Sequence, residues 1–110
     1  MRAHAALMVL GLCAAGVAAA DEPIGFAQGS ILAAKYNCQA CHTTDTAKVG
    51  PSYRDIAKRY GSEPNAIAEL GEHIVNGSSG SWGPQPMPAT AVPDADLKAL
   101  VQWILSLGQA

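Results

Sequence analysis

Few residues of this 110-residue chain could bind a metal or bond covalently to a cofactor, and they lie close together. After residue 20 there are two cysteines, two histidines and one methionine, and three of these five lie in the pentapeptide Cys38-Gln39-Ala40-Cys41-His42. Cysteines at positions i and i+3 lie about one helical turn apart, so both thiols can add to the two vinyl groups of one haem. The adjacent imidazole can then bind the iron. The pentapeptide therefore predicts the attachment site of a c-type haem.

Three other uses of the cysteine pair stay open. A thiol–disulfide oxidoreductase carries such a pair at the start of a helix that follows a strand, whereas this pair follows a helical segment. A structural zinc site would need both cysteines together with His42 and His73, but adjacent Cys41 and His42 cannot easily occupy two corners of one tetrahedron. A plain disulfide would leave His42 and Met87 without a role. A dithiol redox protein is the main alternative to a haem protein.

Met87 is the only methionine after residue 20, and it lies in the proline-rich segment 82–88. Methionine is commonly a filler of hydrophobic cores. Here the flanking prolines instead fix the backbone around the side chain, as the presentation of a weak thioether ligand requires. His42 and Met87 would fill both axial positions of the iron, raise its reduction potential and leave no site for a substrate. The pair predicts an electron carrier and not an enzyme.

The first twenty residues have the composition of an export signal. Sixteen of them are apolar, and a short basic start leads through an apolar stretch to three alanines at 18–20. This order is typical of a cleaved secretory signal, and the stretch is shorter than the ~20 residues that cross a membrane. We expect a signal peptide at 1–20, a mature domain at 21–110, export to the periplasm and no stable membrane insertion.

The mature chain has helical periodicity and no stretch that alternates like a strand. Helices are expected at about 24–37, 51–60, 62–76 and 94–107. Residues 77–93, with four prolines and three glycines, are expected to form an irregular loop. Because a domain of this size has a small core, a bound cofactor would supply much of its centre.

Charge is separated along the chain. The net charge is +3 for residues 35–60, −4 for 61–110 and −3 for 21–110. An acidic total excludes nucleic-acid binding driven by overall basicity. The separation could orient docking to a partner, although solvated helix faces explain any single charge equally well.

The chain resembles class I cytochrome c, most closely the small bacterial periplasmic c-551/c-552 type. The resemblance covers nearly all of 24–107, from the pentapeptide at 38–42 through 49–53 and 76–88 to 103–106. It implies an all-α class I cytochrome c fold, with four to five helices around one covalent haem. It also implies a monomeric electron-transfer protein of a respiratory chain, with a membrane or periplasmic donor and a terminal reductase or oxidase as partners.

The resemblance assigns further roles to single residues. The Pro51 carbonyl would accept the Nδ1 proton of His42, which would fix the ring and strengthen the ligand. Trp82 would direct its indole N–H toward a haem propionate, and Thr90 would lie near the Met87 sulfur. The apolar wall around the haem would consist of Ile56, Leu70, Ile74, Leu100 and Trp103.

Two positions depart from the family pattern. His73 stands where the family commonly has an arginine or another propionate partner. Histidine titrates near neutrality, so a bond from His73 to a propionate would make the reduction potential pH-dependent; an exposed histidine late in a helix is the alternative. Ala33 stands where relatives often carry an aromatic side chain that packs on the last helix, and either Phe26 compensates or a small void remains.

Two other functions stay open for a haem protein of this kind. The chain could be the haem c subunit of a larger dehydrogenase or reductase complex, which co-purification of a stable partner would reveal. It could be a haem peroxidase or ligand sensor if Met87 detaches easily, which carbon monoxide binding would reveal. For the simple carrier, electrons would cross at the partly exposed haem edge near Gln39, Ala40 and the Met87 loop.

Overall fold

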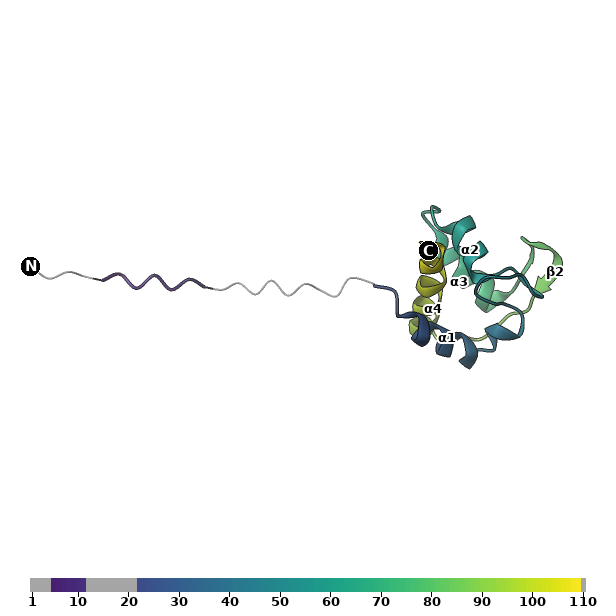
Figure 1. The fold of residues 1–110 in the computed structure, drawn as a ribbon, viewed down its shortest axis with the longest axis horizontal. Helices are drawn as coiled ribbons and strands as arrows, with labels where there is room; N and C mark the ends of the chain where they lie inside the picture. The colour runs from purple at the N-terminus through teal and green to yellow at the C-terminus, as the bar shows by residue number, and fades with distance from the viewer. Residues whose placement is uncertain (1–4, 12–21, 110) are drawn as a thin grey trace, which may run out of the picture.

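Short helices connected by tight turns make up most of the domain. The computed structural model describes residues 5–11 and 22–109. Within them the helices and strands follow one another as α1 (Phe26–Lys35), η1 (Cys38–Ala40), α2 (Tyr53–Tyr60), α3 (Ala66–Asn76), β1 (Ser78–Gly80), β2 (Gly83–Met87), α4 (Asp94–Ser106) and η2 (Leu107–Gln109) (Figure 1). The four predicted helices are confirmed, with shifts of up to four residues at their ends.

Local backbone chemistry explains where the helices begin and end. α1 ends early because Asn37 adopts the left-handed conformation, with φ of 60°, and turns the chain into η1. α2 begins at Tyr53 because the Ser52 hydroxyl accepts a hydrogen bond of 3.0 Å from the Asp55 amide. α3 begins at Ala66 and not near residue 62, since Pro64 disfavours helical backbone at the residue before it.

The prediction of an irregular loop over 77–93 is wrong for its first half. β1 and β2 form an antiparallel hairpin in which Ser78 pairs with Met87 and Gly80 pairs with Gly83. Three glycines allow it, because Gly77, Gly80 and Gly83 have φ values of 80°, 83° and 108°. The prolines of β2 are tolerated because a strand of a two-stranded sheet has one edge without ladder partners.

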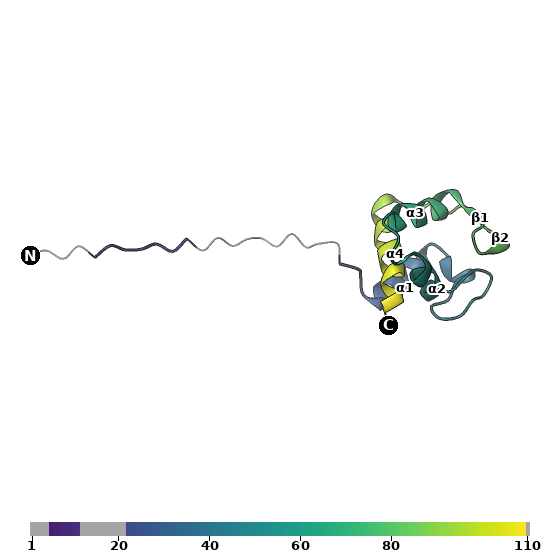
Figure 2. The same ribbon diagram turned by 90° about the horizontal axis from the view of Figure 1, so that it is seen from above.

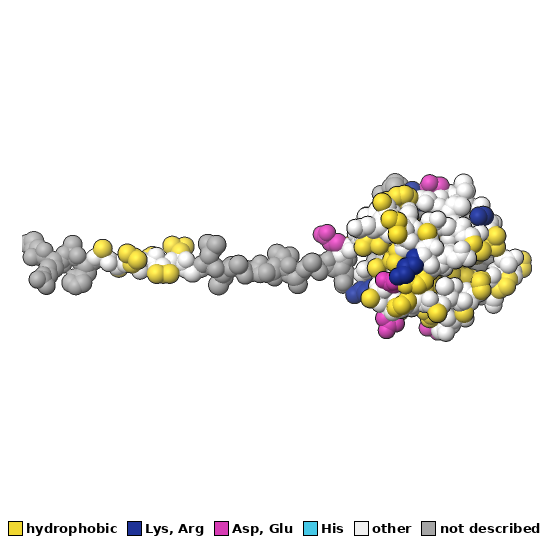
Figure 3. Space-filling model, turned by 90° about the horizontal axis from the view of Figure 1, so that it is seen from below, with side chains coloured by type: hydrophobic (Ala, Val, Ile, Leu, Met, Phe, Trp, Pro, Cys, Tyr) yellow, Lys and Arg dark blue, Asp and Glu magenta, His cyan; other side chains and the backbone are white. Residues whose placement is uncertain are grey.

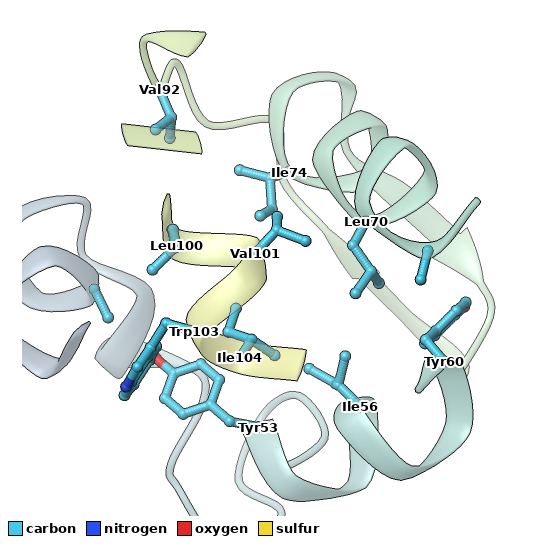
Figure 4. Packing of buried hydrophobic residues seen from close by; sticks show 12 residues of the cluster. Tyr53, Ile56, Tyr60, Leu70, Ile74, Val92, Leu100, Val101, Trp103 and Ile104 are labelled. Atoms are coloured by element: carbon cyan, nitrogen blue, oxygen red, sulfur yellow. The ribbon is translucent and has the colours of Figure 1, made fainter. Parts of the chain in front are cut away.

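α4 is the centre of the core and contacts α1, α2 and α3 (Figure 2). Leu100 and Val101 are completely buried, and Trp103 is 1% exposed. Figure 4 shows the side chains of α4 facing those of α2 and α3, with Trp103 against Tyr53. The two ring centroids lie 5.2 Å apart in an edge-on arrangement. Full burial of a large apolar side chain stabilises the fold by about 1.5–3 kcal/mol, so α4 contributes much of the stability.

The Trp103 indole also explains why α1 has a glycine at position 29. A Cβ at Gly29 would lie 2.2 Å from the indole ring, so the two helices approach more closely than a side chain at this position would allow. The Phe26 ring packs on Trp103 with 6.0 Å between centroids, while Ala33 is completely buried. Phe26 therefore supplies the aromatic contact with the last helix that Ala33 cannot.

Part of the predicted signal peptide is within the described residues. Residues 5–11 have neither helix nor strand, and the side chains of residues 7–10 are 83–89% exposed. The remainder of the 1–20 segment lies outside the described residues. Over 5–11 and 22–109, no helix is long and apolar enough to cross a membrane.

Candidate functional site

The cysteine pair and His42 face one cavity. The left-handed Asn37 starts the turn of η1, and the His42 amide donates to the Cys38 carbonyl at 3.0 Å. Cys38 and Cys41 are therefore one turn apart, and both line the cavity together with His42. His42 is only 8% exposed. The structure thus brings together the three residues predicted to attach haem and bind its iron.

The His42 ring is held from three directions. Its Nδ1 lies 2.6 Å from the Pro51 carbonyl oxygen. The Tyr53 ring stacks on it with 5.6 Å between centroids, and a Cβ at Gly50 would lie 2.7 Å from its Cε1 atom. A carbonyl can only accept, so Nδ1 carries the proton and the lone pair is on Nε2. The contact predicted between His42 and the Pro51 carbonyl is present, and it orients the imidazole with Nε2 free to bind a metal.

The loop of residues 43–51 brings Pro51 to His42. The Gly50 amide donates to the Cys41 carbonyl at 2.8 Å, and the Tyr53 amide donates to the Thr43 carbonyl at 2.9 Å. Arg54 fixes the loop to the rest of the domain. Its Nε lies 2.6 Å from the Asp45 carboxylate, and its Nη1 donates to the Leu107 carbonyl at 2.6 Å. Backbone hydrogen bonds and one exposed ion pair hold this wall together.

The cavity has a volume of about 310 Å³, which is within the range of cofactor pockets. Its apolar wall comes from α2, α3 and α4 and consists of Tyr53, Ile56, Leu70, Ile74, Leu100 and Ile104. Four of the five predicted wall residues are among them. The prediction for Trp103 is wrong, because this indole packs behind Tyr53, against α1. Tyr53 and Ile104 occupy the wall instead, since the helical faces meet at angles that periodicity alone does not determine.

Met87 lies at the end of β2 and lines the same cavity. Figure 2 shows the hairpin apart from the loop of residues 43–51, so the two segments form different sides of the cavity. The end of α3 holds the base of the hairpin: a Cβ at Gly77 would lie 2.8 Å from the Met87 carbonyl. The Thr90 amide donates to the Ile74 carbonyl at 2.8 Å, while Thr90 does not line the cavity.

His73 and Trp82 also line the cavity, as polar side chains at its rim. His73 meets the Tyr60 ring edge-on, with 6.4 Å between centroids. Trp82 is 43% exposed, and the Arg59 guanidinium carbon lies 4.6 Å above its ring centroid. Sequence reasoning did not identify Arg59, because a basic residue on a short helix has no motif that indicates a distant aromatic partner.

The alternatives for the cysteine pair are disfavoured by the structure. Cys38 and Cys41 are not joined to each other. Burial raises the pKa of the Cys38 thiol, whereas redox-active pairs depend on a lowered value. Burial also raises the pKa of Tyr53, with a smaller contribution from Cys38. Among the residues described here, no three His, Cys, Asp or Glu side chains gather as a metal site, which removes the support for zinc.

Residues 26–108 match the cytochrome c family. This chain belongs to the cytochrome c family. Cytochrome c-551 of Pseudomonas aeruginosa is 41% identical over 100 residues, which cover 91% of this chain and 90% of the relative. Cytochrome c-552 of Nitrosomonas europaea is 49% identical over 85 residues, covering 76% and 82% of the two chains. The crystal structure of that wild-type cytochrome c552 has a TM-score of 0.69 to this chain at 49% identity, covering 71% and 98%.

The family and its solved structures establish the class of this cytochrome. It has the class I cytochrome c fold, with the helical order around the cavity described above. Its cofactor is a covalently attached haem c with its iron, and its function is electron transfer and not catalysis. The cavity is where the haem fits, since thiols, an oriented imidazole, a thioether and an apolar wall meet there.

Proposed function

We propose that this cytochrome c holds its haem through thioether bonds from Cys38 and Cys41 and binds the iron through His42 and Met87. The observation that carries the proposal is the oriented His42 ring, whose Nδ1 lies 2.6 Å from the Pro51 carbonyl in a cavity that both cysteines and Met87 line. A haem bound there supplies a reversible one-electron change at its iron.

The protein side chains around the haem would determine its reduction potential. His42 and Met87 would together hold the iron, and an imidazole with a thioether would favour a high potential and leave no ligand position for a substrate. The Pro51 carbonyl keeps the imidazole in one tautomer and orientation, so it need not rearrange when the charge changes. The apolar wall excludes water from the buried side. These features suit a carrier that exchanges electrons without bond rearrangement.

Trp82 and His73 are proposed as the partners of the haem propionates. Both line the cavity at its rim, and both carry ring N–H groups that can donate to a carboxylate. Trp82 donates whatever the pH. If His73 takes up a proton there, its positive charge would couple the potential of the iron to pH.

We also propose that residues 1–20 are a signal peptide and that the mature domain, 21–110, works in the periplasm as a monomer. The sequence of this segment and the exposed apolar side chains of residues 7–10 support the proposal. Its redox partners would be a membrane or periplasmic donor and a terminal reductase or oxidase. Electrons would cross near the exposed residues Gln39 and Ala40, beside the haem attachment site.

The attachment is tested with the mature chain made alongside haem-attachment machinery. The protein should be red and keep its haem after acid–acetone extraction, and changing both Cys38 and Cys41 to serine should release it. Met87→Ala should lower the potential and allow carbon monoxide to bind the ferrous protein. An unchanged potential in Met87→Ala would refute Met87 as a ligand, and haem lost from the parent protein on extraction would refute covalent attachment. Gel filtration and co-purification test the monomer against a subunit of a larger complex.

A further inference from the structure

One side chain of α2, Arg59, contacts the turn of the β1–β2 hairpin. The turn residues are Ser81 and Trp82, between the paired Gly80 and Gly83. Arg59 donates through Nη1 to the Ser81 carbonyl. Its guanidinium carbon also lies 4.6 Å from the centroid of the Trp82 ring. One arginine therefore contacts both residues of the turn, with a hydrogen bond to one and a cation–π contact to the other.

The hairpin depends on contacts of this kind because it buries little apolar surface itself. Its residues are exposed or half-buried along their whole length. Figures 1 and 2 show the hairpin projecting beyond the end of α3. α3 holds the base, through the close approach of Gly77 to the Met87 carbonyl. Arg59 of α2 holds the opposite end, which is the turn. The hairpin is therefore attached to α3 at its base and to α2 at its turn.

Arg59 is itself anchored. Its guanidinium carbon lies 5.5 Å from the centroid of the Tyr60 ring, and Tyr60 is buried in the core. A planar guanidinium can contact aromatic rings and donate to a carbonyl at the same time, whereas a lysine ammonium lacks this geometry. Figure 3 shows how sparsely charged side chains are distributed on one face of the domain, among many hydrophobic ones.

We propose that Arg59 is a positioning residue that holds the hairpin turn against α2 and thereby keeps Met87 and Trp82 in place at the haem cavity. The proposal rests on the proposed ligand role of Met87. A cation over the indole face also draws electron density from the ring, which makes the Trp82 N–H a stronger donor toward an anionic partner. By holding this turn, Arg59 thus positions both Met87, the proposed iron ligand, and Trp82 at the rim of the cavity.

The test compares Arg59→Ala and Arg59→Lys with Lys58→Ala in the haem-loaded protein. Lys58 is the preceding residue of α2 and is exposed, so its removal changes the charge equally without touching the turn. Amide hydrogen exchange over residues 78–87 should be about tenfold faster in Arg59→Ala. This variant loses both the cation–π contact with Trp82 and the charge-assisted hydrogen bond to Ser81. Amides of α4 should be unaffected. Arg59→Lys should fall between Arg59→Ala and the parent, and Lys58→Ala should match the parent.

A second measurement follows Met87 itself. The methionine-to-iron charge-transfer band of the ferric protein should disappear at lower pH or lower temperature in Arg59→Ala than in Lys58→Ala. In a Trp82→Leu background, the further effect of Arg59→Ala should shrink, because one of the two contacts is already absent. Equal hairpin exchange in Arg59→Ala and Lys58→Ala would overturn the inference. A parent protein without the methionine band would instead refute the ligand proposal, while the exchange data would still decide whether Arg59 ties the turn.

Discussion

The two sides of the haem cavity are built in different ways. On the histidine side, residues 38–53, the proposed ligand His42 is buried, hydrogen-bonded to Pro51 and stacked on a core tyrosine. On the methionine side, residues 78–90, the proposed ligand Met87 is on an exposed hairpin held at its base by α3 and at its turn by Arg59. Damage to the first side should therefore impair folding and haem loading, whereas damage to the second should change ligation in a folded protein.

Gly50→Ala should have the largest effect, because it damages the histidine side. The new Cβ would lie 2.7 Å from the His42 Cε1 atom, so the ring must move away from Pro51. We expect a loss of about 3 kcal/mol in the free energy of unfolding, together with a low yield of attached haem. Gly25→Ala is the control, since its Cβ meets open space. Thermal unfolding and haem content report the difference, and equal values for both variants would contradict the picture of a pre-oriented ring.

Gly77→Ala should have a smaller effect that is confined to the methionine side. Gly77 has φ of 80° and its Cβ would lie 2.8 Å from the Met87 carbonyl. We expect about 1–2 kcal/mol of destabilisation, with haem retained and the methionine band weakened. Gly80→Ala carries the same backbone cost at φ of 83° but meets open space. If Gly80→Ala weakens the band equally, backbone strain and not the contact with Met87 is responsible.

His73→Gln should change the pH dependence of the potential and leave both sides of the cavity intact. A protonated His73 at a propionate disfavours the additional positive charge of the ferric state. The potential of the parent protein should therefore fall as pH rises and His73 loses its proton, while the potential of the variant should not change with pH. Potentiometry between about pH 5 and pH 9 measures this. A parallel pH dependence in the two proteins would show that another group is responsible.

Asp96→Asn should have the smallest effect, because Asp96 lies in the first turn of α4 and contacts Lys35 and Tyr36 at the end of α1, away from the proposed ligands. A hydrogen bond from Tyr36 lowers the pKa of Asp96, with a further contribution from Lys35 at 3.5 Å. A lowered folded-state pKa stabilises the fold above the ordinary value of 3.8, and this contribution disappears as the pH falls through the folded value. The variant should thus lose a little thermal stability at about pH 6 and converge with the parent once the pH falls below the folded-state pKa of Asp96. A difference in thermal stability between variant and parent that persists at acid pH would indicate a packing effect instead.

The sequence anticipated the two sides of the cavity unequally. Cys38, Cys41 and His42 were predicted because they form a contiguous pattern, and the Pro51 contact was predicted from family resemblance. The hairpin was missed, because a segment rich in proline and glycine reads as an irregular loop until three positive φ values and a pairing register are seen. Trp103 was assigned to the cavity wall from family resemblance, which did not reveal that in this chain the indole packs against Tyr53 and Phe26.

By itself, the sequence indicated the chemistry that we propose for this cytochrome, namely which thiols, which imidazole and which thioether would hold the haem. It also predicted four helices in a domain of a size that needs a cofactor. These properties are local, since they depend on residue type and spacing over a few positions. Only the tertiary structure decided which side chains share the cavity, that Tyr53 rather than Trp103 forms its wall, and that Arg59 reaches the hairpin turn 22 residues further along the chain. Such contacts depend on the angles and distances at which helices pack, and these are fixed by the whole core.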